Sequence, residues 1–431
     1  MARPIAYDVT HLVFRMAARA MTGIDRIDLA YGRHFAAADG AVTGAFCGAA
    51  GPHVMNAATL RKIVRQAQRG SWEHEPLETD KNFLRVRDWL DGQVPGPEVA
   101  RKLISPRVGL ANQLAARLWW GRCRTARWNR TVPAGAIYLN IAEHWLEYHR
   151  YFDWLSSRPD VQAVFFVHDL LPLDYPEYFR PGYEAVFRRR FETIAKRGTA
   201  FVVSTNVVRD RLRTALAPQG KSEAPIHVAP FPSPLALADV ADAGSDAPSH
   251  PYFVLVSTIE PRKNHLLVLN VWRELAALLG DATPRLVLVG SRGWENEQVI
   301  DMLDRCTGIA DNVLRTSRVS RHGLTWLIRH AQALLMPSFD EGYGLPLVEA
   351  LSLGTPVIAS DTATFREVTR RSALLLSAID GIAWRDAIMT YATRAAPAWQ
   401  LAKAKAKAKP FRPPNWDGYF RRLDEFLTSL P

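Results

Sequence analysis

The sequence predicts an α/β protein with parallel sheets, and three observations support this prediction. Residues 337–361 follow an apolar run at 333–336 and contain a second apolar run at 356–359. Further short apolar runs lie between helical patterns at 136–141, 163–167, 200–204, 253–257 and 285–290. This alternation is typical of parallel sheets whose strands are joined by helices. The 431 residues, 48% of them hydrophobic, are enough for about two to three domains with large cores.

Residues 337–361, PSFDEGYGLPLVEALSLGTPVIASD, show the unit in detail. Gly342 and Gly344 indicate a sharply bent loop after the first strand. Pro346 suits the first turn of a helix, because a proline lacks only an N–H that has no helical partner there. Gly354 is a typical residue just beyond a helix C-terminus. The stretch is therefore predicted to be a strand, a loop, a helix and a second strand.

Two carboxylates in this unit predict a ligand site. Glu341 lies in the loop and Glu349 in the first turns of the helix. A bent loop brings both toward one ligand, and paired acceptor oxygens bind sugar hydroxyls. The adjoining helix N-terminus has unpaired N–H groups that suit a phosphate. The alternative is that Glu341 is an ordinary surface carboxylate and Glu349 a solvated helix residue. The glycines, the proline and the flanking strands together favour the ligand site.

The segments FDEGYGLPLVEA and GTPVIASD resemble the E-x7-E signature of the group 1 glycosyltransferases, which retain configuration, use nucleotide sugars and have the GT-B fold. The resemblance covers residues 136 to 380 well and the two ends loosely. It implies two Rossmann-like domains facing a cleft, with the terminal helix crossing back to the N-terminal domain. It also implies that Glu341 is catalytic beside the donor sugar, and that the donor is bound by Gly342, Tyr343, Gly344, Leu345 and Glu349.

Composition and the resemblance together predict the domain boundaries. An N-terminal, acceptor-binding domain takes residues 1–235 and includes an insertion at about 50–130 whose structure the sequence does not indicate. Residues 236–250 lie in a stretch rich in Pro, Ala, Asp and Ser and are assigned as a linker. The donor-binding domain follows at 251–400. Residues 401–431 begin with alternating Ala and Lys, a basic tether without an apolar face, and end in an amphipathic helix.

Two residues of the N-terminal half are candidates for the site. Gly23 lies between a predicted strand and a helix, where a glycine lets backbone approach a ligand closely. The resemblance places such a glycine near the donor diphosphate or the acceptor, with Arg26 in support, although a turn-forming glycine is an equal alternative. His168 directly follows the strand at 163–167, at the sheet edge where ligands bind in α/β proteins. The segment HD resembles the family segment whose histidine lies beside the donor sugar, so His168 is expected to be catalytic rather than structural.

The donor-binding half contains a predicted phosphate site in the segment EPRKN. Arg262 and Lys263 lie between a strand and a helix, where cations can neutralise a diphosphate. The segment is similar to the phosphate-binding loop of the family, although many members have a further arginine where this chain has Ser257. Surface cations near a helix start are the alternative. The resemblance also implies that the backbone of Val319 and Ser320 reads the nucleobase.

The charge predicts acidic partners. The net charge is +11 and the sequence pI is about 9.7, yet no nucleic-acid-binding signature is present. Residues 117–130, RLWWGRCRTARWNR, combine arginine with Trp119, Trp120 and Trp128. This pattern fits docking to an anionic membrane, the alternative being a solvated arginine face with inward-packed tryptophans. We expect a cytoplasmic protein that is peripheral at the inner membrane face. The cysteines are scattered, no apolar run reaches about 18 residues, and the N-terminal residues show no signal-peptide cleavage pattern.

The resemblance implies a retaining hexosyltransferase that acts without a metal or other cofactor. No Asp-x-Asp pair, the usual metal-binding arrangement of the other main glycosyltransferase fold, is present. The segments EGYGLP and EPRKN favour mannose as the donor sugar. The acceptor is expected to be a glycan or a polyprenyl- or lipid-linked sugar in surface polysaccharide or lipopolysaccharide synthesis. A nucleotide-sugar epimerase of similar fold and a catalytically silent nucleotide-sugar-binding scaffold are the alternatives.

Overall fold

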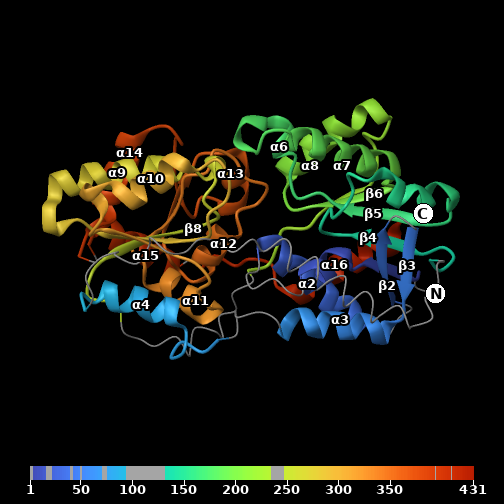
Figure 1. The fold of residues 1–431 in the computed structure, drawn as a ribbon, viewed down its shortest axis with the longest axis horizontal. Coiled ribbons are helices and arrows are strands. Elements are labelled where there is room, and N and C mark those ends of the chain that lie inside the picture. The colour runs from blue at the N-terminus through green and yellow to red at the C-terminus, as the bar shows by residue number, and fades with distance from the viewer. Residues whose placement is uncertain are drawn as a thin grey trace.

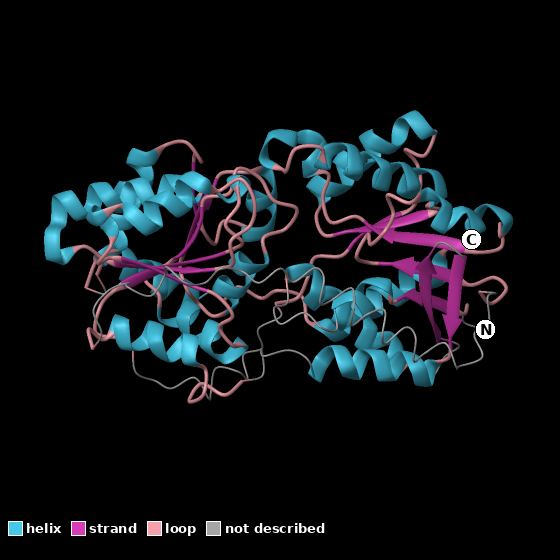
Figure 2. Ribbon diagram, viewed as in Figure 1, coloured by secondary structure: helices cyan, strands magenta, loops and turns pink. Residues whose placement is uncertain are grey.

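The computed structural model describes residues 3–15, 22–38, 42–48, 51–69, 75–93, 132–233, 247–393, 395–408 and 410–431. These residues form two lobes, each a sheet with helices on both faces (Figures 1 and 2). The predicted α/β class with two Rossmann-like domains is therefore confirmed. Residues 117–130, predicted to dock on a membrane, and most of the predicted linker lie outside the described residues. None of the described helices has an apolar stretch long enough to cross a bilayer.

The N-terminal sheet has the strand order β3-β2-β1-β4-β5-β6-β7, and all neighbours are parallel except the hairpin pair β2 and β3. Its central strands are buried except at the first residue of β1 and of β5, because helices cover both faces. Its strands are β1 (Ile5–Asp8), β2 (Val42–Gly48), β3 (Gly51–Met55), β4 (Ile137–Asn140), β5 (Gln162–Phe166), β6 (Ala200–Val203) and β7 (Ile226–Val228).

Two sets of helices enclose this sheet (Figure 1). One face carries α1 (Thr10–Arg15), α2 (Gly23–Ala37) and α3 (Ala57–Arg69), and the other carries α7 (Tyr183–Arg197) and α8 (Asn206–Leu216). The short helix α6 (Leu171–Asp174) follows β5. Because every parallel strand ends at the same edge, the loops after β1, β4, β5 and β6 are neighbours there.

The C-terminal sheet is parallel throughout, in the order β10-β9-β8-β11-β12-β13. Its strands are β8 (Tyr252–Val256), β9 (Arg285–Val289), β10 (Val313–Thr316), β11 (Leu334–Met336), β12 (Val357–Ser360) and β13 (Leu374–Leu376). One face packs against α9 (His265–Leu279), α10 (Glu297–Arg305) and α14 (Gly381–Tyr391), and the other against α11 (Arg321–His330) and α12 (Leu345–Ser352). Helix α13 (Ala363–Thr369) follows β12.

The terminal helix α16 (Trp416–Ser429) packs on the N-terminal domain, as the resemblance implied (Figure 1). The hydroxyl groups of Tyr419 and Tyr31 lie 2.6 Å apart, and Phe420 stacks on His34 with ring centroids 4.1 Å apart. Before it, the Ala–Lys segment forms the second half of α15 (Pro397–Ala408). This helix is held to the C-terminal domain, since the Trp399 indole N–H donates to the Gln332 carbonyl at 2.9 Å.

A second helix crosses in the opposite direction. Helix α4 (Lys81–Leu90) precedes β4 in the chain, yet it covers the C-terminal sheet beside α11 (Figure 1). Its Phe83 ring lies 5.2 Å from that of Trp326, and the Arg285 guanidinium lies 4.7 Å above the ring of Trp89. Burial of Phe83 and Trp89, each 2% exposed, accounts for the crossing. The structure thus assigns a place to part of the insertion that the sequence did not explain.

Candidate active site

The loop between β11 and α12 is shaped by two glycines that tolerate no side chain. Gly344 has a φ of 92°, and a Cβ there would lie 2.8 Å from the Phe365 ring. At Gly342 a Cβ would lie only 2.3 Å from the carbonyl oxygen of His168. Leu345 then begins α12, whose first turn has no capping side chain. The loop therefore brings its backbone directly against the end of β5 in the other domain.

Glu341 is at the centre of a buried cluster of charges. Its carboxylate pairs with the Lys263 ammonium, lies 2.8 Å from the Arg262 guanidinium, and accepts from the Ser338 hydroxyl at 2.8 Å. Burial alone would raise the pKa of Glu341, but Arg262 and Lys263 outweigh it and lower the pKa to about 2. Arg262 also donates to the Asp340 carbonyl at 2.7 Å. The structure thus brings together three residues that the sequence analysis assigned to the site.

Glu349 is buried rather than solvated, with 1% of its surface exposed. It pairs across the domains with Arg26 of α2 at 3.3 Å. Next to this pair, a Cβ on Gly23 would lie 3.0 Å from the Leu345 side chain. The N-termini of α2 and α12 therefore lie close together. Thr22 and Asp25 cap the first turn of α2, whereas α12 has no capping side chain, and its N-terminus suits an anion.

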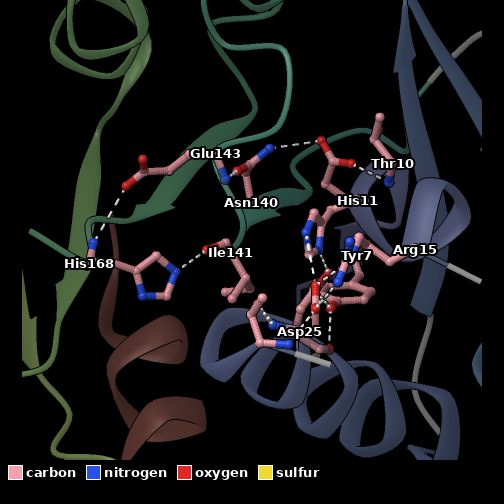
Figure 3. Close-up of polar contacts among 12 residues, drawn as sticks. Tyr7, Thr10, His11, Arg15, Asp25, Asn140, Ile141, Glu143 and His168 are labelled. Atoms are coloured by element: carbon pink, nitrogen blue, oxygen red, sulfur yellow. Dashed lines mark hydrogen bonds and ion pairs between the residues drawn. The ribbon is translucent and has the colours of Figure 1, made fainter. Parts of the chain in front are cut away.

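His168 lies half-buried just beyond β5, with its ring directed toward Ile141 (Figure 3). Its Nε2 donates to the Ile141 carbonyl at 2.7 Å, so in the neutral ring Nδ1 is an acceptor. Burial lowers the pKa of His168 to about 4, and the ring is therefore uncharged near pH 7. An uncharged imidazole with a free acceptor nitrogen can bind a hydroxyl group.

Several contacts fix this loop to the N-terminal domain. The Gly342 carbonyl accepts from the hydroxyl groups of Ser204 at 3.1 Å and Thr205 at 3.4 Å. The buried Tyr343 donates its hydroxyl to the Phe231 carbonyl at 2.7 Å. Tyr343, assigned to the donor from the sequence, thus holds the loop in place through its hydroxyl. The two domains are therefore in direct contact at these residues.

The proposed nucleobase contact lies at the start of α11. Val319 is 4% exposed, and Ser320 is the N-cap residue of the helix. The Ser320 backbone N–H donates at 2.6 Å to Asp80, which also caps α4 by accepting from the N–H groups of residues 82 and 83. The Ser320 N–H, one of the two backbone groups expected to contact the nucleobase, is therefore bound by the N-cap residue of α4.

The chain shows similarity to glycosyltransferases in sequence and in fold. Residues 243–380 match the family model described as glycosyl transferases group 1. The C-terminal domain is a group 1 glycosyltransferase domain. Over half of its length, the chain is 28% identical to the serotype-specific mannosyltransferase WbdA of Escherichia coli, of which it spans 28%. Over 52% of its length, it is 27% identical to the O-antigen chain mannosyltransferase RfbU of Salmonella typhimurium, of which it spans 58%.

Solved structures support the GT-B fold over the whole chain. An α,α-trehalose-phosphate synthase from Burkholderia vietnamiensis aligns with a TM-score of 0.58, covering 100% of this chain and 98% of that one at 12% identity. Anabaena HepE, determined with UDP, aligns with a TM-score of 0.56, covering 99% and 100% at 12% identity. The resemblance inferred from the E-x7-E segment is confirmed.

The structure reveals a set of polar residues that the sequence analysis missed (Figure 3). They lie at and after the ends of β1 and β4 and in α2, on the side of the N-terminal domain that we call the N-terminal wall. His11 lies 2.9 Å from Asp28 and 3.2 Å from Asp25, which also binds Arg15 at 2.6 Å. Asp8, at the end of β1, accepts from Asn140 at 2.9 Å. The sequence signal was available, since Asp8 is the polar last residue of an otherwise apolar strand. Among the described residues, no group of three His, Cys, Asp or Glu side chains is arranged to hold a metal ion.

Proposed function

We propose that this glycosyltransferase moves a hexose, with mannose as the first candidate, from a nucleoside-diphosphate sugar to a glycan or lipid-linked acceptor, with retention at the anomeric carbon. One observation carries the proposal: Arg262, Lys263 and Glu341 form a single cluster directly opposite His168. The mannosyltransferases WbdA and RfbU among the relatives support mannose. They also support a role in surface polysaccharide or lipopolysaccharide synthesis.

Each side chain of the cluster has a part in this proposal, and Glu341 lies beside the donor sugar, where its carboxylate stabilises the positive charge that develops at the anomeric carbon. Arg262 and Lys263 stabilise the negative charge that grows on the departing diphosphate, aided by the positive end of α12. The acceptor hydroxyl oxygen bonds to the anomeric carbon as the bond from that carbon to the diphosphate breaks. The hydroxyl proton passes to the departing diphosphate. His168 Nδ1 binds a hydroxyl of the donor sugar, and Glu349 binds the ribose hydroxyls of the nucleotide.

The reaction is proposed to need no divalent ion. It is proposed to take place at the cytoplasmic face of a membrane. Two half-buried cations, Arg262 and Lys263, supply positive charge where a divalent ion acts in other nucleotide-sugar enzymes. The basic segment at 117–130 is proposed to dock on anionic lipid.

Replacing Lys263 tests the assignment of the diphosphate site. We expect Lys263→Ala to lose about 10²-fold or more in turnover, the scale for one electrostatic donor to a developing charge. Lys196→Ala, at an exposed position of α7, is the matched control and should transfer at the wild-type rate. Wild-type turnover in Lys263→Ala would contradict the assignment.

A further inference from the structure

Glu143 is held in an unusual backbone conformation on the N-terminal wall (Figure 3). It follows β4 with a φ of 55°, a region that residues other than glycine seldom adopt. Its backbone N–H donates to the Asn140 side-chain oxygen at 3.1 Å, and the Asn140 amide in turn donates to Asp8 at 2.9 Å. These contacts fix the position of the Glu143 side chain, which is 8% exposed.

The Glu143 carboxylate has few partners for a buried group. One oxygen accepts from the His168 backbone N–H at the long distance of 3.4 Å, and the other has no hydrogen-bond partner among the described residues. The nearby Arg190 is bound by Glu147 at 2.9 Å. One carboxylate oxygen of Glu143 therefore remains able to accept a hydrogen bond from a ligand hydroxyl.

Glu143 lies beside the reaction centre of the proposed transfer but on its N-terminal side. It contacts the backbone N–H of His168, while Gly342 of the donor loop approaches the carbonyl of the same residue. Burial raises the pKa of Glu143 to about 7, with Arg190 opposing and Asp169 adding to the rise. In both protonation states the carboxyl has an oxygen that can accept a hydrogen bond from a hydroxyl group.

A row of aromatic rings extends from Glu143 along the same sheet edge. The Trp145 ring lies 4.7 Å from Phe14 and 5.5 Å from Tyr151, and Tyr151 stacks on Tyr148 at 5.2 Å. Tyr148 is 46% exposed and the other three rings are half-buried. Aromatic faces with a few fixed polar groups beside them suit a ligand that has apolar faces and hydroxyl edges.

We propose that Glu143 and this aromatic row form the acceptor site, and that the acceptor is a saccharide. Glu143 accepts a hydrogen bond from a hydroxyl of the acceptor sugar next to the reacting one and so orients that sugar, and Trp145 with its neighbouring rings binds the sugar units that follow. The inference rests on the proposed function and adds the class of acceptor to it.

The test measures acceptor and donor behaviour separately in full-length protein. Transfer from GDP-mannose to mannotriose gives KM and kcat for the acceptor, and calorimetry gives the affinity for GDP. We expect Glu143→Gln, which keeps the side-chain volume, to lower kcat/KM for mannotriose at least tenfold while the GDP affinity stays within twofold. Trp145→Ala should raise KM for mannotriose more than for methyl mannoside. Glu192→Gln, at an exposed carboxylate of α7, is the matched control.

Three results would overturn the inference. They are an unchanged kcat/KM for mannotriose in both variants, an equal loss of GDP affinity in Glu143→Gln, or transfer to a polyprenyl-phosphate mannose that neither substitution affects. Glu143→Asp, which keeps the charge, serves as the second variant where Glu143→Gln is unstable and should also impair mannotriose. Wild-type protein that neither binds GDP nor transfers mannose would instead count against the proposed function, so the two failures are distinguishable.

Discussion

Replacing Glu341 by glutamine should destabilise the fold by an amount that depends on pH. The carboxylate is buried between Arg262 and Lys263, which lower its pKa from 4.5 to about 2. Each pKa unit corresponds to 1.36 kcal/mol, so the charged carboxylate contributes about 3 kcal/mol to the free energy of unfolding at pH 7. Glu341→Gln keeps the volume and removes this contribution, leaving two cations without their common partner.

The sign of the pH dependence follows from the lowered pKa. Because the folded-state pKa lies below the unfolded one, the contribution of Glu341 is fully present above pH 4.5 and is lost as the pH falls toward 2. The difference between wild type and Glu341→Gln should therefore shrink from about 3 kcal/mol at pH 7 to about 1 kcal/mol at pH 3.

Urea denaturation at both pH values measures this difference. Glu297→Gln, whose side chain is 72% exposed in the same domain, is the control and should match the wild type at each pH. Equal unfolding free energies for wild type and Glu341→Gln at pH 7 would refute the argument. A difference of the same size at pH 3 would refute the electrostatic explanation.

Four further predictions follow from the account. Glu349→Gln should weaken GDP binding in calorimetry and leave kcat at saturating donor unchanged, because ribose contacts are alike in ground and transition states; normal affinity would limit Glu349 to its ion pair. EDTA should leave the transfer rate largely intact, and a strict requirement for Mg²⁺ or Mn²⁺ would contradict the metal-free mechanism. Sedimentation with anionic liposomes should be strong at low salt and weaker after Trp119→Ala and Trp120→Ala; equal binding to neutral vesicles would indicate inward-packed tryptophans. Asp80→Asn keeps the cap of α4 but not the acceptor for the Ser320 N–H. The free energy of unfolding in urea should therefore fall by about 1–3 kcal/mol, and calorimetry should show weaker GDP binding; unchanged values would argue against this contact.

The loop between β11 and α12 was predictable because the residues that determine its shape are close together in the sequence. Gly342 and Gly344 impose the bend, and Pro346 marks the helix that follows. The strand preceding His168 was equally readable as a continuous apolar run that ends at a polar residue. The family resemblance, rather than any local pattern, supplied the crossing of α16.

The remaining features depend on contacts between distant parts of the chain. Helix α4 binds Ser320, 240 residues beyond Asp80, and nothing in the local sequence of α4 indicates that partner. Glu349 forms an ion pair with Arg26 of the other domain. Glu143 acquires its position from a backbone conformation that its residue type does not favour. Such features follow from the packing of the two domains and were beyond sequence analysis.

A transfer assay with labelled nucleotide sugars tests the central claim most directly. Wild type, Lys263→Ala and Lys196→Ala would each be incubated with a panel that includes GDP-mannose, with mannotriose and a polyprenyl-phosphate mannose as acceptors. The account predicts that wild type and Lys196→Ala transfer label to an acceptor through an α-linkage, with release of nucleoside diphosphate, and that Lys263→Ala is nearly inactive. Interconversion of the donor sugar without transfer, as in an epimerase, or nucleotide-sugar binding without any reaction would contradict it.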